Sequence, residues 1–202
     1  MALLAAGCSS AESQPDPTPS HKAMRVTHAQ IKSASNSPKS LVPAGHWALV
    51  HRPKDRPIPA HTYLVRIVSV VKGASGDLKK VKLMGPDQPL SMKTAVPYYV
   101  AFQSAMVKGN PDNADGPGGN VAIDKGHDNK IGILQYASQF GDRCRPPTDD
   151  GASWDPKNSV STTCQVVVTA PGAQYAPTML QVGWTGHGPA AKLKVPTPKS
   201  TV

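Results

Sequence analysis

Apolar and polar residues alternate in short segments along most of the chain after residue 40. In segment 63–72, the residues Tyr63, Val65, Ile67 and Val71 share one face. The same alternation, with a period of two residues, recurs at 46–51, 78–83, 98–106, 122–123, 131–136, 164–168, 180–184 and 193–195. This period is typical of half-buried β-strands, so the pattern predicts seven to nine short strands and no convincing helix.

Clusters of proline, glycine, aspartate and asparagine separate these segments. The chain contains 21 prolines and 17 glycines among 202 residues, 19 valines against 11 leucines, and a single glutamate. Helix-forming residues are scarce and strand formers are frequent, which favours an all-β fold. The number and spacing of the strands predict an immunoglobulin-like antiparallel β-sandwich. A small barrel with a similar number of strands is the alternative architecture.

The residues before position 40 lack the alternating pattern and are rich in Ser, Pro, Thr, Asn and Lys. Such a composition buries too little apolar area to offset its ordering entropy. We therefore predict a flexible, disordered tether over 8–40, a sandwich domain over 41–196 and a C-terminal tail over 197–202. Residues 1–7 are interpreted as the remnant of a lipoprotein signal. After residue 8 no run is long and apolar enough to span a bilayer.

The N-terminal sequence resembles the end of a bacterial lipoprotein signal. Small residues, Ala5-Ala6-Gly7, precede Cys8, and Leu4 lies one position further out than the usual aliphatic residue. A signal also needs a charged region and a longer apolar stretch, which seven residues do not provide. The resemblance implies that Cys8 is acylated and anchors the chain to the extracytoplasmic face of the cell membrane. The alternative is an ordinary apolar N-terminus with a chance cysteine.

The other two cysteines, Cys144 and Cys164, each follow a turn signal. In an oxidising compartment they are expected to form a disulfide. Closing a loop of about 20 residues adds roughly 3 kcal/mol of stability in the chain-entropy model. A metal site or two free thiols are the alternatives, but no second cysteine pair supplies the spacing of a zinc site.

Three motifs resemble a known family. They are segment 63–73 followed by Gly76-Asp77-Leu78, segment 97–100, and Phe140 to Cys144 followed by a Pro-rich loop and segment 163–168. Together they resemble the immunoglobulin-like domain of unknown function in actinobacterial secreted lipoproteins, similar to the mycobacterial immunoprotective extracellular antigens. The resemblance implies a β-sandwich with the two cysteines joining strand ends, and it implies no catalytic residues. The insert 110–120 departs from the family pattern.

The chain is strongly basic, with a formal net charge of +9. A basic surface can meet nucleic acid, anionic lipid or an anionic cell-wall polymer. Aromatic residues make up 5% of the chain and no groove-entering helix is predicted, so nucleic acid is not expected as a partner. The expected partners are the membrane, an envelope protein or an anionic polymer, and a dispersed solvated surface is the simplest alternative.

No nucleophile elbow, phosphate-binding loop, dinucleotide fingerprint or H-E-x-x-H motif occurs in the sequence. The sequence therefore predicts a non-enzymatic protein with no cofactor. Its leading hypothesis is a binding or adhesion module at the cell envelope. Trp47 and Trp154 are possible partner contacts, whereas Trp184 is expected in the core.

A metal-handling lipoprotein is the second hypothesis. His46, His51 and His61 lie close in sequence and suit Cu or Zn, and Met84 and Met92 are possible soft ligands. Oxygen ligands for Ca²⁺ are available from Asp112, Asn113, Asp115, Asp124, Asp128 and Asn129, although Pro111 breaks the usual loop spacing. Surface histidines in a basic loop and ordinary turns are the competing explanations. A third hypothesis is a structural protein whose basic face docks on an anionic polymer.

Overall fold

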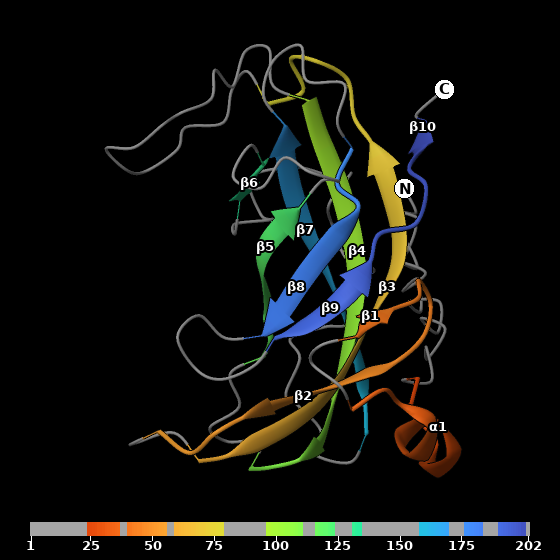
Figure 1. Ribbon diagram of the computed structural model, residues 1–202, viewed down its shortest axis with the longest axis vertical. Helices are drawn as coiled ribbons and strands as arrows, with labels where there is room; N and C mark the ends of the chain where they lie inside the picture. Colours follow the sequence, from red (N-terminus) through yellow and green to blue (C-terminus); the bar gives the residue numbers. More distant parts are fainter. Residues whose placement is uncertain are drawn as a thin grey trace, which may run out of the picture.

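The computed structural model describes residues 24–36, 40–55, 59–78, 96–110, 116–123, 131–134, 158–169, 176–183 and 190–200. These residues form one short helix and ten strands (Figure 1). The elements are α1 (His28–Ser33), β1 (Leu41–Val42), β2 (Ala48–Arg52), β3 (His61–Lys72), β4 (Val96–Lys108), β5 (Gly118–Ile123), β6 (Ile131–Leu134), β7 (Val160–Thr169), β8 (Met179–Gly183), β9 (Ala191–Lys194) and β10 (Lys199–Ser200).

The strands form two sheets. One has the order β1-β9-β8-β5, and the other has the order β10-β3-β4-β7-β6 with β2 paired to β3. Most neighbours are antiparallel. The short strand β1 pairs in parallel with β9, and the short strand β10 pairs in parallel with β3. The predicted all-β sandwich is therefore confirmed.

The main core lies between the two sheets. Tyr63 and Val65 of β3 and Phe102 of β4 meet Leu180 and Val182 of β8 in one buried cluster. The alternation seen in segments 98–106 and 180–184 thus marks the faces that the sheets turn toward each other. Each large apolar side chain buried in this way contributes about 1.5–3 kcal/mol of transfer free energy.

A β-bulge in β3 changes which residues of that strand face the core. The pairing register with β4 shifts between Ile67 and Ser69. The extra residue, Val68, is 48% exposed, and Val70 rather than Val71 joins the buried core cluster. The prediction that Val71 shares a face with Ile67 was therefore wrong, because a bulge inserts one residue and reverses the alternation beyond it.

The N-terminal segment 24–36 packs on the domain, so the folded part begins before the boundary predicted at residue 41. The backbone N–H of Val26 donates to the carbonyl of Asn158 at 2.9 Å, and that of Val160 donates to Met24 at 2.8 Å. Thr27 and Gln30 form a capping box at the start of α1. This motif is the signal from which the helix was predictable, although six residues are too few to show helical periodicity.

A second apolar cluster lies on the outer face of the six-stranded sheet, beneath segment 24–36. It contains Trp47, Leu64, Ala105 and Val160, with Val26 from the N-terminal segment. Trp47 is 7% exposed. The structure thus corrects its prediction as a partner contact, since the indole is covered by residues assigned to a tether.

The structure leaves part of the strand prediction outside the described residues. In segment 78–83, Leu78 is described as a buried residue in a turn, and the residues that follow it are not. Among the described residues, no helix is long and apolar enough to cross a membrane.

Candidate functional site

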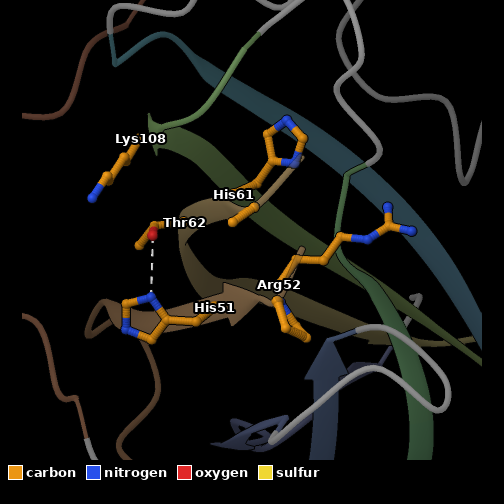
Figure 2. A pocket seen from close by; sticks show the side chains of 7 residues that line it. His51, Arg52, His61, Thr62 and Lys108 are labelled. Carbon is orange, nitrogen blue, oxygen red and sulfur yellow. Dashed lines mark hydrogen bonds between the residues drawn. The ribbon is translucent and has the colours of Figure 1, made fainter. Parts of the chain in front are cut away.

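A pocket of about 390 Å³ lies where the β2–β3 hairpin meets the end of β4 (Figure 2). Its size falls in the range of small-molecule sites. The residues that line it come from the end of β2, the start of β3 and the last residue of β4: His51, Arg52, Pro53, Ala60, His61, Thr62 and Lys108.

Strand pairing divides these side chains between two faces. Arg52 pairs with His61, and His51 pairs with Thr62, which in turn pairs with Lys108. Because successive residues of a strand point to opposite faces, the first pair lies on the core side and the other residues lie on the outer side. Figure 2 shows His51, Thr62 and Lys108 on one side of the hairpin and Arg52 and His61 on the other.

The imidazole of His51 is held by hydrogen bonds at both nitrogens. Nε2 lies 3.2 Å from Asn36 Oδ1, and Nδ1 lies 3.1 Å from Thr62 Oγ1. An amide oxygen accepts, so Nε2 donates to Asn36, and in the neutral ring Nδ1 accepts from the Thr62 hydroxyl. These two hydrogen bonds hold the exposed imidazole between Asn36 and the Thr62 hydroxyl.

His61 is buried, with 1% of its surface exposed. Its Nε2 donates to the carbonyl of Asn110 at 3.1 Å, since a carbonyl oxygen can only accept. The other ring nitrogen, Nδ1, is buried without a hydrogen-bond partner. Gly109 lies against the ring, where a Cβ would overlap His61. His61 thus ties the end of β4 to the start of β3.

The pocket lining is basic. Arg52 and Lys108 contribute two positive charges, and neither Asp nor Glu occurs among the lining residues. In the part of the chain that the structure describes, Asp55 and Asp77 are the acidic residues. The site therefore has the charge and the hydrogen-bond donors to hold an anionic group.

The histidines named from the sequence reach different places. His51 and His61 line the same pocket, whereas His46 is not part of its lining. Across the described ranges, no group of three or more His, Cys, Asp or Glu side chains is placed to hold a metal ion. Asp112, Asn113, Asp115, Asp124, Asp128, Asn129, Met84 and Met92 lie outside those ranges, as do Cys8, Trp154 and Trp184.

Cys164 lies on β7, opposite Ala101 of β4, and is 8% exposed. It is disulfide-bonded, and its partner is outside the described residues. Cys144 is also outside them, so its pairing with Cys164 stays a prediction.

Sequence reasoning missed Arg52, Thr62 and Lys108 as residues of one site. Arg52 and Thr62 belong to a hairpin whose pairing was not assigned, and Lys108 lies 46 positions after Thr62 along the chain. Only the register of β3 against β4 brings them together. Comparison of the chain with protein-family models, curated proteins and solved structures finds no match.

Proposed function

We propose that this protein is a non-enzymatic binding module of the cell envelope, held at the extracytoplasmic face of the membrane by acylated Cys8. The observation that carries the proposal is the pocket at the β2–β3 hairpin, which lies on a rigid sandwich. Loops and strand ends on such scaffolds are common ligand sites.

The anchor is supported by the sequence around Cys8, where the small residues Ala5-Ala6-Gly7 precede the cysteine. A diacylglyceryl group offers two chains, enough for stable membrane attachment. The resemblance to actinobacterial lipoproteins with an immunoglobulin-like domain supports the same proposal.

The disulfide between Cys144 and Cys164 belongs to this proposal, because export places both thiols in an oxidising compartment. Cys164 is buried on the outer face of β7. A bridge there would link the sheet to residues between β6 and β7 in the sequence.

Metabolic labelling with an alkyne fatty acid tests the anchor. The wild-type protein is expected to carry the label and to sediment with membranes, whereas Cys8→Ser is expected to be unlabelled. The matched variant Ser20→Cys, made in the Cys8→Ser background, should also be unlabelled, because Pro17-Thr18-Pro19 rather than a run of small residues precedes this position. An unlabelled, soluble wild-type protein would refute the anchor.

Retention on isolated cell envelopes tests the binding module. The Cys8→Ser protein is used so that lipid insertion does not contribute, and the assay is run at physiological salt, which screens distant surface charges but leaves close contacts in the pocket. Ala60 lines the pocket and is exposed, so Ala60→Trp fills the pocket without disturbing the core. Retention should fall at least about fivefold, as expected when a ligand loses its cavity contacts.

Thr197→Trp is the matched control, because Thr197 is exposed and lies outside the pocket. It should be retained as well as the parent. Retention of the parent at background level, or equal loss in both tryptophan variants, would contradict a binding role for the pocket.

A further inference from the structure

Three polar side chains form one row across the strands at the pocket. His51 of β2 pairs with Thr62 of β3, and Thr62 pairs with Lys108 at the end of β4. All three line the pocket, and Figure 2 shows them on the same side of the hairpin. Directly opposite residues on neighbouring strands have Cβ atoms about 5 Å apart. The strand register therefore brings an imidazole, a hydroxyl and an ammonium group within reach of one small ligand.

The charge at the pocket is positive. Lys108 is exposed, and Arg52 adds a second, buried cation to the lining. Neither aspartate nor glutamate occurs among the lining residues. Both cations attract an anionic group in the pocket, and water screens this attraction less there than at an open surface. The lining thus favours an acid over a neutral or cationic ligand.

The type of hydrogen-bond donor favours a carboxylate over a phosphate. Phosphate sites commonly use several backbone N–H groups, at a helix N-terminus or in a glycine-rich loop. Here the lining residues include no glycine, Thr62 is paired on both sides by β2 and β4, and Pro53 has no N–H. The pocket therefore offers mainly side-chain donors, which are enough for the two oxygens of a carboxylate.

The rest of the pocket fits an apolar group. Its volume is about 390 Å³, whereas a water molecule takes about 30 Å³ in the liquid, so an inorganic ion would leave most of the pocket empty. Pro53, Ala60 and the methyl group of Thr62 provide apolar surface in the lining. Such surface stabilises a bound ligand when its apolar area is removed from water. A ligand that fills the pocket therefore carries an apolar body beside its charged group.

We propose that the pocket binds a carboxylate carried on a small apolar body, with the carboxylate paired to Lys108 and hydrogen-bonded to Thr62. The inference rests on the proposed function, because that function uses the same pocket, and it adds the class of ligand. The carboxylate belongs either to a free organic acid or to a group displayed by an envelope component. The two sources share the same chemistry at the pocket.

The hydrogen bonds of His51 couple this binding to protonation. In the neutral ring Nδ1 accepts the Thr62 hydroxyl proton, so that proton does not reach the ligand. In the imidazolium both nitrogens donate, Nε2 to Asn36 and Nδ1 to Thr62 Oγ1, and the hydroxyl is then free to donate to the carboxylate. Protonation of the ring thus supplies one further donor to the ligand.

The charges around His51 make its protonation depend on the ligand. Asn36 and Thr62, which contact the ring, are uncharged. Lys108 lies on the same side of the hairpin and opposes a second positive charge, whereas Arg52 and His61 lie on the other side. A bound carboxylate offsets this repulsion. Binding should therefore tighten by about three- to tenfold, the worth of one hydrogen bond, as pH falls from about 8 to about 6.

NMR titration of the full-length Cys8→Ser protein with benzoate and with hexanoate tests the ligand class. Amide signals of the pocket residues should shift and saturate with a Kd of about 1 mM, as expected for acids of this size. Benzamide has the same shape without the charge and should bind at least about tenfold more weakly. Absence of binding by both acids, or equal binding of benzoate and benzamide, would overturn the proposal. Tighter binding of phenyl phosphate than of benzoate would also overturn it.

Lysine variants test the charge pair. Lys108→Gln should weaken benzoate binding about tenfold and leave benzamide binding unchanged, because only the acid pairs with the ammonium group. Lys194→Gln is the matched control, since Lys194 is exposed and lies outside the pocket, and it should bind benzoate like the parent. Equal weakening in both variants would show attraction by net charge and would contradict a specific site.

Histidine variants test the proton. His51→Gln should bind benzoate with the same affinity at both pH values. His46→Gln should keep the pH dependence of the parent, because His46 is exposed and is not part of the lining. Undiminished pH dependence in His51→Gln would show that another group takes up the proton and would refute the role of His51.

The ligand class and the proposed function fail separately. If Ala60→Trp lowers retention on envelopes but neither acid binds, the pocket is a binding site and the ligand class is wrong. If the acids bind but the parent is not retained on envelopes, the ligand class stands, the acid is a free one, and envelope binding is wrong. If both hold, release of the protein from envelopes by excess benzoate assigns the carboxylate to an envelope component, and retention in its presence refutes that source.

Discussion

The guanidinium of Arg66 lies over the ring of Trp47, 4.4 Å from its centroid. Its Nε and one terminal nitrogen also donate to Gln103 Oε1 at 2.9 and 2.7 Å. Gln103 in turn donates to Thr162 at 3.3 Å. The side chains of Arg66, Gln103 and Thr162 thus form a chain of hydrogen bonds across β3, β4 and β7. It lies on the outer face of the sheet, beside the second apolar cluster.

Arg66→Met tests how much the contact of Arg66 with Trp47 and Gln103 stabilises the fold. Methionine keeps an apolar stem on the indole but removes the charge and both donors. Burial lowers the pKa of Arg66, so the cation is partly desolvated and its contact with the ring is stronger than at an open surface. We expect a loss of about 1–2 kcal/mol in the free energy of unfolding, measured with urea. Lys194→Met, at an exposed position, should change it by less than about 0.5 kcal/mol.

Gly109 and Gly45 offer a matched pair of substitutions. Both have positive φ, +141° and +81°, but a Cβ at Gly109 would overlap His61 whereas one at Gly45 meets nothing within 4 Å. Gly45→Ala should lower the free energy of unfolding by about 1 kcal/mol, because of its backbone conformation alone. Gly109→Ala should lower it by about 2–4 kcal/mol, because its Cβ also overlaps His61. Equal losses in thermal or urea unfolding would mean that His61 moves aside freely.

Two N-terminal truncations test where the domain begins. The protein lacking residues 1–23 is the reference. Removal of residues 1–36 should lower the unfolding free energy by about 3 kcal/mol or more below that reference, because it also deletes Val26 and uncovers Trp47 and Leu64. Equal stability of the two truncated proteins would contradict the packing of segment 24–36 on the sheet.

Tyr98 makes stability depend on pH in the alkaline range. Burial raises the pKa of its phenol above the ordinary value of 10.0. The unfolded state therefore loses this proton at lower pH than the folded state does. The contribution of the protonated phenol to the free energy of unfolding is complete below pH 10 and is lost as pH rises through the folded pKa. The unfolding free energy should fall above pH 10, and Tyr98→Phe should flatten that part of the profile. A profile unchanged by this substitution would contradict the assignment.

Serine substitutions test the pairing of Cys144 with Cys164. If the two form one bridge, Cys144→Ser, Cys164→Ser and the double variant should each lose about 3 kcal/mol in non-reducing urea unfolding, without additivity. Cys8→Ser should leave the domain's stability unchanged. A loss with Cys164→Ser but none with Cys144→Ser would assign a different partner to Cys164.

The sequence by itself determined that segments 63–72 and 98–106 become strands. Alternation in 98–106 depends on the period of the strand alone, so it marked Tyr98, Val100 and Phe102 as core residues before any pairing was known. The abundance of valine and the turn formers between segments likewise predicted the all-β class, because these preferences are local.

The tertiary structure decided what depends on pairing between distant segments. The bulge that turns Val70 inward exists only in the register of β3 against β4. Trp47 is buried because segment 24–36, polar in composition, lies over it. His51, Arg52, His61 and Lys108 share a pocket because hairpin formation and the end of β4 place them there. Such contacts cannot be predicted from the local sequence, because their energy arises between residues that only the folded chain brings together.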